Sequence, residues 1–269
     1  HTPKEEKQAA SPLHRRNALL HRVSDTRFFS IGVLSAVLFF LAERVDSHAV
    51  AFIFKPIPIF CLMAWVQWNA KTPSWFRRLI LVGLFFGSLG DIFLSMGHKD
   101  AFIHGLGAFL VGHIFYAIAF RSVSIERRLH WQAAHLIPFA LWCGGVLVYL
   151  RSFGNTGAFF VPLCGYTILL MIVCWNSSLA ALDRIAHAEL PLHLAFWQKY
   201  APVIGAVLFT SSDMMIAFDK FIPAFYSSST TRMIYMILYY VGQWAIAYST
   251  IERKGSAKRS SPQNSAKRA

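Results

Sequence analysis

Long runs of apolar residues, separated by short polar segments, recur along almost the whole chain. The runs are continuous, without the alternation of apolar and polar positions that marks a half-buried strand. Most approach the roughly 20 residues with which a helix crosses a hydrocarbon core about 30 Å thick. The pattern therefore predicts eight membrane-spanning helices, approximately at residues 28–42, 49–68, 79–96, 101–120, 134–150, 157–175, 200–218 and 233–250.

The same runs exclude a transmembrane β-barrel, in which lipid-facing and lumen-facing residues alternate along each strand. Helices remain because they satisfy their own backbone hydrogen bonds within the bilayer. Composition agrees: 55% of the 269 residues are hydrophobic, 14% are charged, and the mean hydropathy is +0.45. We therefore expect an all-α integral membrane protein instead of a soluble domain.

Basic residues are unevenly distributed around these runs. Twenty Lys and Arg residues lie in the two tails and in the loops on the same side of the membrane as the tails, against five on the other side. Since basic loops stay in the cytosol, this count predicts that both termini are cytosolic. The expected organisation is a disordered basic tail over residues 1–27, an eight-helix transmembrane domain over 28–251 and a second such tail over 252–269.

The net charge of +13 does not require a nucleic-acid partner, because most of it would face anionic lipid headgroups. The bilayer is the expected partner, and homo-oligomer formation is compatible with the sequence. No metal site or other cofactor is expected. The four cysteines lie within predicted spans without a C-x-x-C pair, namely Cys61, Cys143, Cys164 and Cys174.

Three ionisable residues lie inside the predicted spans, where a charge is costly and marks a candidate functional site. Asp91 and Asp213 follow 12 and 13 residues after the cytosolic ends of their spans, which places both about 18–20 Å into the membrane. Lys55 lies six residues from the opposite end of its span, at about the same depth. The three groups are therefore expected to meet at one level.

Helical spacing indicates which neighbours each acid has. Gly83, Gly87 and Asp91 recur every four residues, so Asp91 lies on a stripe of small residues that a second helix can approach closely. Ser88 precedes Asp91 by three residues and shares its face. Its hydroxyl is expected to bond either to the acid or to the helix backbone.

Asp213 lies in a similar segment. Thr210 precedes it by three residues, and FTSSDMMIA resembles FGSLGDIFL around Asp91. The following spans carry VGH at residues 111–113 and VGQ at residues 241–243. An offset of four spans is compatible with a parallel 4+4 repeat, whose junction would hold one Asp from each half.

The polar residues allow two interpretations, a functional cavity or hydrogen bonds that only hold the bundle together. His113 and Tyr116 share one face of their span, and Tyr239 and Gln243 share a face of the last span. Lys55 precedes two prolines, so it would either satisfy the carbonyls that they free or bind an anionic group.

Several segments resemble the lysoplasmalogenase (YhhN-type) family of eight-span membrane proteins. They are FKPIPIF around Lys55, FFGSLGDIFL around Asp91, GLGAFLVGHIFYAIAF, GAVLFTSSDMMIAF around Asp213 and YYVGQWAIAYS. Together they extend over most of the chain from residue 28 to about 251. The longer basic tails and the extended stretch between the sixth and seventh spans depart from the family.

The resemblance implies hydrolysis of the vinyl ether bond of a lysoplasmalogen, without a cofactor, in the endoplasmic reticulum or another endomembrane. Protonation at carbon requires an acid, and the resulting cation requires a carboxylate, so Asp91 and Asp213 are the expected acid/base pair, with the acid role open. Lys55 is expected at the phosphate. The alternative function is a proton-coupled transporter that uses the same two acids. The remaining expected substrate-site residues are Ser88, His113, Tyr116, Thr210, Tyr239 and Gln243.

Overall fold

The computed structural model describes residues 12–45, 47–70, 72, 74–96, 99–124, 133–186, 192–223, 225 and 228–251. Regular secondary structure within these ranges is helical. The elements are α1 (Pro12–Arg44), α2 (His48–Phe54), α3 (Ile57–Asn69), α4 (Ser74–Ser95), α5 (Lys99–Ser122), α7 (Ile137–Phe153), the 3₁₀ turn η1 (Gly157–Phe159), α8 (Phe160–Ala186), α9 (Leu192–Phe221) and α10 (Ser229–Tyr248).

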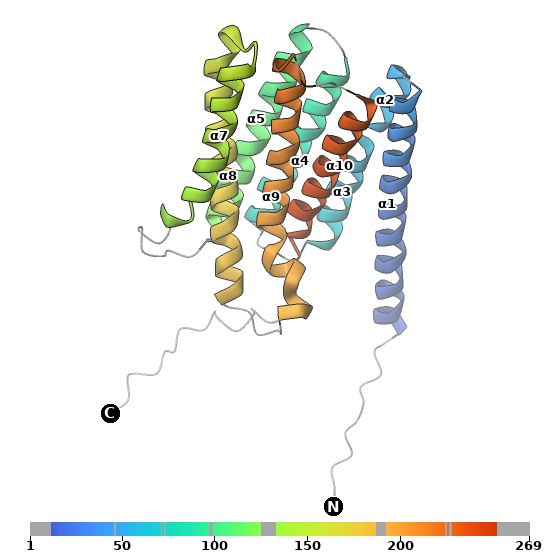
Figure 1. The fold of residues 1–269 in the computed structure, drawn as a ribbon. Coiled ribbons are helices and arrows are strands. Elements are labelled where there is room, and N and C mark those ends of the chain that lie inside the picture. Colours follow the sequence, from blue (N-terminus) through green and yellow to red (C-terminus); the bar gives the residue numbers. More distant parts are fainter. Residues whose placement is uncertain are drawn as a thin grey trace, which may run out of the picture.

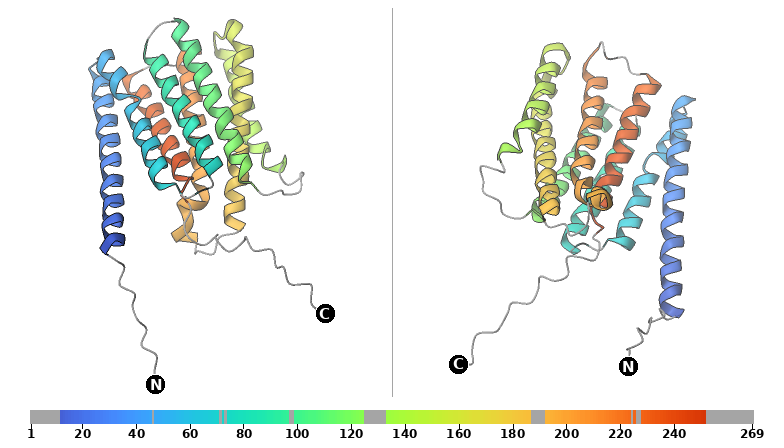
Figure 2. Two further views of the ribbon diagram at one scale, coloured as in Figure 1. Left: turned by 180° about the vertical axis from the view of Figure 1, so that it is seen from behind. Right: turned by 60° about the horizontal axis from the view of Figure 1, so that its bottom comes forward.

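The long helices form a bundle in which they run roughly side by side (Figure 1). The most extensive contacts join α4 to α5 and α9 to α10, and α8 packs against both α5 and α9. Helix α1 lies at one edge against α3, and α7 lies at the other edge against α8 (Figure 2). The buried polar residues therefore come mainly from the central helices α4, α5, α8, α9 and α10.

Five segments of the described chain are long and apolar enough to cross a membrane. They are Ala49–Asn69, Ser74–Ser95, Ala101–Ser122, Gly157–Ile185 and Lys199–Phe221, with α7 as a shorter apolar helix. Large apolar side chains such as Leu34, Leu141, Val148 and Val161 are exposed on the outer faces of the bundle, where lipid would cover them. The protein is therefore an integral membrane protein with several spans.

One apolar segment is broken into two helices, α2 and α3, at Lys55 and Pro56. Pro58 has no N–H to donate to the carbonyl of Phe54, and that carbonyl accepts a hydrogen bond of 2.9 Å from Ser35 Oγ of α1. The carbonyl of Lys55 accepts one of 2.8 Å from the hydroxyl of Tyr240 of α10. Neighbouring helices thus replace the intrahelical donors at the break.

The predicted runs all fall largely within helices, but the first helix begins earlier than its apolar run. Helix α1 starts at Pro12, inside the segment 1–27 that the sequence assigns to a disordered tail. Proline suits the first turn of a helix, and residues 13–27 contain neither another proline nor a glycine to end it. Residues 1–11 and the predicted tail at 252–269 lie outside the described residues.

Close packing of the central helices depends on glycines that face a neighbouring helix. A Cβ placed on Gly83 of α4 would lie 2.1 Å from the ring of Tyr116 of α5. On Gly242 of α10, a Cβ would lie 2.9 Å from the backbone nitrogen of Phe209 of α9. The stripe of small residues predicted on α4 therefore does admit neighbouring helices, with Tyr116 of α5 against Gly83 and the polar side chains of Tyr239 and Gln243 of α10 beside Gly87.

Candidate functional site

The two acidic residues predicted from the sequence are both buried near the centre of the bundle. Asp91 of α4 is 1% exposed and Asp213 of α9 is 8% exposed. They lie close enough to interact electrostatically, yet each has its own partners. Because a buried charge is costly unless it is paired, those partners decide the chemistry of each acid.

Asp91 pairs with the lysine at the break between α2 and α3. Lys55 Nζ lies 3.5 Å from Oδ1 of Asp91, and both side chains are nearly inaccessible to solvent. The second carboxylate oxygen, Oδ2, is buried and has no hydrogen-bond partner among the described residues. The ammonium group therefore offsets the charge of Asp91 while leaving one oxygen as a hydrogen-bond acceptor.

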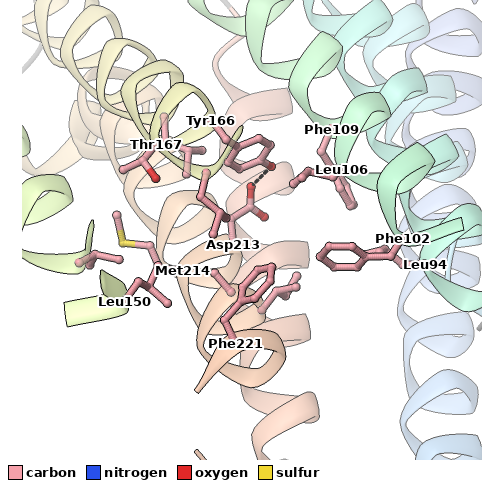
Figure 3. A pocket seen from close by; sticks show the side chains of 15 residues that line it. Leu94, Phe102, Leu106, Phe109, Leu150, Tyr166, Thr167, Asp213, Met214 and Phe221 are labelled. Carbon is pink, nitrogen blue, oxygen red and sulfur yellow. Dashed lines mark hydrogen bonds between the residues drawn. The ribbon is translucent and has the colours of Figure 1, made fainter. Parts of the chain in front are cut away.

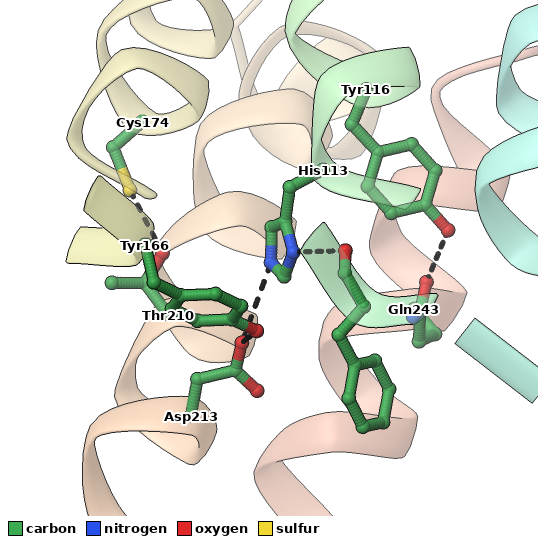
Figure 4. Close-up of polar contacts among 8 residues, drawn as sticks. His113, Tyr116, Tyr166, Cys174, Thr210, Asp213 and Gln243 are labelled. Atoms are coloured by element: carbon green, nitrogen blue, oxygen red, sulfur yellow. Dashed lines mark hydrogen bonds and ion pairs between the residues drawn. The ribbon is translucent and has the colours of Figure 1, made fainter. Parts of the chain in front are cut away.

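Asp213 is surrounded by an aromatic hydroxyl and an imidazole (Figure 4). The hydroxyl of Tyr166, on α8, donates a hydrogen bond of 2.5 Å to Oδ2 of Asp213. Nε2 of His113, on α5, lies 3.4 Å from the same oxygen. The imidazole ring stacks on Phe209 with a centroid distance of 4.6 Å, which fixes its plane beside the acid.

His113 makes one hydrogen bond, to the backbone, and its other ring nitrogen faces Asp213. Nδ1 lies 2.6 Å from the backbone carbonyl of Phe109, and because a carbonyl only accepts, Nδ1 carries a hydrogen. Without a proton between them, the lone pairs of Nε2 and of the carboxylate oxygen would repel each other. The contact is therefore favourable only when either the imidazole or the acid carries a proton there. The pair is therefore able to hold one transferable proton away from bulk water.

A second group of polar atoms lies beside Gly87 of α4. A Cβ on Gly87 would be 3.1 Å from Nε2 of Gln243 and 3.3 Å from the hydroxyl of Tyr239. Both atoms are buried without a hydrogen-bond partner in the described part of the chain. Tyr239 also interacts electrostatically with Asp91, one turn beyond Gly87. Three polar atoms with unused hydrogen-bonding capacity therefore gather at this position: Asp91 Oδ2, Tyr239 Oη and Gln243 Nε2.

The other predicted polar residues hold these groups in place to different degrees. The hydroxyl of Tyr116 donates a hydrogen bond of 2.7 Å to Oε1 of Gln243, which fixes the amide. Ser88 donates to the carbonyl of Phe85 instead of to Asp91. Thr210 lies 3.2 Å from the sulfur of Cys174. The two hydroxyls expected beside the acids are thus in the same layer but do not bond to them.

An apolar cavity of about 40 Å³ ends at Asp213. Its walls come from α4, α5, α7, α8 and α9, and Asp213 with Tyr166 forms its polar end (Figure 3). A cavity of this size admits water, which needs roughly 10–15 Å³, but must widen for a hydrocarbon chain. Other lining residues include Phe102, Leu106, Leu150, Thr167, Met214 and Phe221.

A larger apolar groove of about 620 Å³ lies between α1, α3 and α10. None of the predicted site residues lines it. Its contact with the polar layer is Tyr240, which donates to the carbonyl of Lys55. Within the described residues, no group of three or more His, Cys, Asp and Glu side chains is arranged to hold a metal ion.

Sequence reasoning missed Tyr166 and Tyr240, which contact the acid and the broken helix, respectively. A tyrosine in an apolar span carries no charge and resembles the many aromatic residues that face lipid. The available signal for Tyr166 was its polar neighbour Thr167 in an otherwise apolar run, which is too weak to identify a partner on another helix.

Known proteins resemble this chain over most of its length. It is 34% identical to lysoplasmalogenase TMEM86A of Homo sapiens over 211 residues, which cover 76% of this chain and 80% of that protein. A lysoplasmalogenase homolog of Dictyostelium discoideum is 27% identical, covering 83% and 85%. Lysoplasmalogenase TMEM86B of Mus musculus is also 27% identical, covering 85% and 88%.

No solved structure matches the chain significantly. The YhhN family model, however, matches residues 50–250, a range that contains Lys55, both buried acids and the partners of each. The chain therefore belongs to the YhhN family.

Proposed function

We propose that the protein is a lysoplasmalogenase, a membrane hydrolase that cleaves the vinyl ether bond of a lysoplasmalogen to a fatty aldehyde and a glycerophospho-alcohol. The relatives named lysoplasmalogenases support this reaction. The structural observation that carries it is Asp213 at the end of an apolar cavity, with Tyr166 and His113 on one carboxylate oxygen. That arrangement suits an acid that acts on an apolar substrate.

In the proposed first step, Asp213 protonates the vinyl carbon that is not bonded to oxygen. The O–H bond of the acid breaks, the π electrons form the new C–H bond, and an oxocarbenium ion remains between carbon and the ether oxygen. The proton that is transferred is the one that Asp213 shares with His113 at Oδ2, where Tyr166 also donates a hydrogen bond that stabilises the carboxylate left behind. General acids in enzymes typically contribute a factor of about 10²–10⁴ in rate.

Water must then add to the cationic carbon, and the group around Asp91 suits this step. Asp91 Oδ2 accepts a hydrogen bond, Gln243 Nε2 donates one, and the hydroxyl of Tyr239 does either. Buried water typically makes about three such bonds. As the new C–O bond forms, the water proton passes to Asp91. The hemiacetal hydroxyl then gives its proton to Asp213 as the aldehyde forms, its C–O bond to glycerol breaks, and the glycerol oxygen takes the proton held by Asp91.

The proposed setting is an eight-span bundle with both termini in the cytosol, within an endomembrane. Besides the five spans already described, α7, α1 and α10 would cross the bilayer. Helix α1 exposes large apolar side chains between Phe29 and Leu41, and α10 buries Tyr239 and Gln243 against the other helices. Helix α1 begins and α10 ends at the same end of the bundle (Figure 1), as an even number of spans requires.

The decisive experiment compares three substrates that differ in one bond. Purified protein in detergent is expected to cleave the alkenyl lysophospholipid, leave the saturated alkyl ether intact and act poorly on the acyl ester. Only the vinyl ether has a π bond that Asp213 can protonate. In heavy water, a promptly trapped aldehyde should carry one deuterium on its α-carbon.

Equal cleavage of ester and vinyl ether, or an aldehyde without the deuterium, would overturn the acid mechanism. Failure to release any aldehyde would overturn the function itself and return the two acids to the transporter interpretation. The control for contaminating hydrolases is an Asp213→Asn variant. It should elute from size-exclusion chromatography at the same volume as the wild type.

A further inference from the structure

Lys220 lies in the last turn of α9, beside the cavity that contains Asp213. Nζ of Lys220 is 4.8 Å from the centroid of the ring of Phe102, and Phe102 lines the cavity. The side chain is exposed, whereas Ile216 and Phe221 on the same helix face the cavity. Lys220 therefore carries a positive charge beside the rim of an otherwise apolar cavity.

The helical register places this charge directly above the acid. Lys220 follows Asp213 by seven residues. On an α-helix, seven residues fall about 20° short of two full turns, so the two side chains lie on nearly the same face. Viewed down the helix axis, Lys220 points between Ile216 and Ala217, both of which line the cavity. Because Cβ atoms tilt toward the N-terminus of a helix, the side chain of Lys220 leans back toward the level of Asp213.

The separation fits the proposed substrate. Seven residues of helix rise about 10.5 Å. In a lysoplasmalogen roughly five single bonds of about 1.5 Å join the vinyl ether oxygen to phosphorus, which span at most ~7 Å. With a contact of about 3 Å at each end, one molecule reaches from Asp213 to Lys220.

The residue first expected at the phosphate is occupied elsewhere. Lys55 is buried and forms an ion pair with Asp91, so bringing a phosphate to it would leave that acid unpaired. Lys220 has no ion-pair partner among the described residues. The neighbouring Asp219 interacts with Tyr235 of α10 instead.

We propose that Lys220 binds the phosphate of the lysophospholipid substrate and holds its vinyl ether bond at the depth of Asp213. This inference rests on the proposed function, and it identifies the class of ligand as a phosphate ester of a single-chain glycerol ether. The substrate then enters from the leaflet at the α9 C-terminal end of the bundle, opposite the start of α1.

The test pairs two substrates with three variants. The substrates are an alkenyl lysophospholipid and the matching alkenyl glycerol, which lacks the phosphate. Lys220→Gln is expected to raise KM for the phospholipid about tenfold with little change in kcat, and to leave the kinetics on the alkenyl glycerol unchanged. Lys220→Arg should retain near wild-type KM, because a guanidinium also binds phosphate.

Arg151→Gln is the matched control. Arg151 lies at the same end of the bundle, is exposed and packs over an aromatic ring, that of Phe160, which does not line the cavity. Its removal should change neither substrate's KM. A purely electrostatic effect of the surface would instead make Arg151→Gln resemble Lys220→Gln, and would overturn the proposal.

An equal effect of Lys220→Gln on both substrates, or no effect on either, would also overturn it. A direct measurement covers the case in which no turnover is found. The saturated alkyl lysophospholipid is titrated into wild type and Lys220→Gln by calorimetry, and Kd should rise about tenfold in the variant. Equal affinities would refute the phosphate site, whereas weaker binding without turnover would refute only the proposed hydrolysis.

Discussion

At the scale of single residues, the two acids differ in what surrounds them. Asp91 faces an ammonium group, which offsets its charge and favours a stable carboxylate. Asp213 faces a phenol and an imidazole that share a proton with it, and it borders the cavity. The contrast resembles glycoside hydrolysis, in which two carboxyl groups take opposite roles because their environments differ.

This assignment predicts a graded series of variants around Asp213. Asp213→Asn should lower aldehyde release at saturating substrate by about a hundredfold or more, because the transferable proton is lost. Tyr166→Phe should lower it about tenfold, since the acid remains but one charge-assisted hydrogen bond is gone. Asp219→Asn, on the same helix but away from the cavity, should match the wild type.

The rates are compared at equal amounts of folded, detergent-solubilised protein. Wild-type turnover by Asp213→Asn would exclude this acid from the reaction. A loss in Tyr166→Phe as large as that in Asp213→Asn would mean that the phenol itself transfers the proton.

From the sequence, the charged residues of the candidate site could be identified, together with the residues that share a helix face with them. Lys55, Asp91 and Asp213 were identified because charges are costly inside a span, whereas the pairing of the first two is seen only in the structure. The partners of Ser88 and Thr210 were not predictable. A serine hydroxyl in a helix has a backbone carbonyl within reach, as Ser88 shows, and the partner of Thr210 comes from α8.

At the scale of helices, contact between α9 and α10 brings Gln243 and Tyr239 toward α4. The contact is close because Gly242 meets backbone atoms of α9, with Phe209 nitrogen 2.9 Å and Gly205 oxygen 3.1 Å from an added Cβ. Backbone atoms in a packed helix pair cannot move aside as a flexible side chain can.

Gly242→Ala is therefore expected to destabilise the protein by about 1–3 kcal/mol, seen as a lower thermal unfolding midpoint in detergent. Gly144→Ala on α7 is the control, because no atom lies within 4 Å of its added Cβ. That variant should unfold at or slightly above the wild-type temperature, since alanine favours a helix. Equal midpoints for both variants would contradict the tight contact.

The helices were largely predictable, whereas their ends and breaks were not. An apolar run marks the part of a helix that meets lipid, so the first run begins at residue 28 although α1 begins at Pro12. The prolines at 56 and 58 indicated a break in the second run. That Ser35 and Tyr240 would complete its hydrogen bonds depends on tertiary contacts between segments far apart in the sequence.

At the scale of the whole molecule, the proposed topology has both termini on the cytosolic side. Twenty basic residues on that side against five on the other favour this orientation. Tags at the two ends should therefore both be accessible to antibody when only the plasma membrane is permeabilised. A tag on the opposite side at one end would require an odd number of spans.

The break between α2 and α3 has a consequence for which substitutions the protein tolerates. Both acceptors at the break are main-chain carbonyls, those of Phe54 and Lys55, and no exchange of side chain removes them. Their donors are single hydroxyl groups on Ser35 and Tyr240. The hydrogen bonds that join three helices at the break thus depend on the chemical identity of two residues far apart in the sequence, whereas the apolar residues around them can be exchanged for others of similar size.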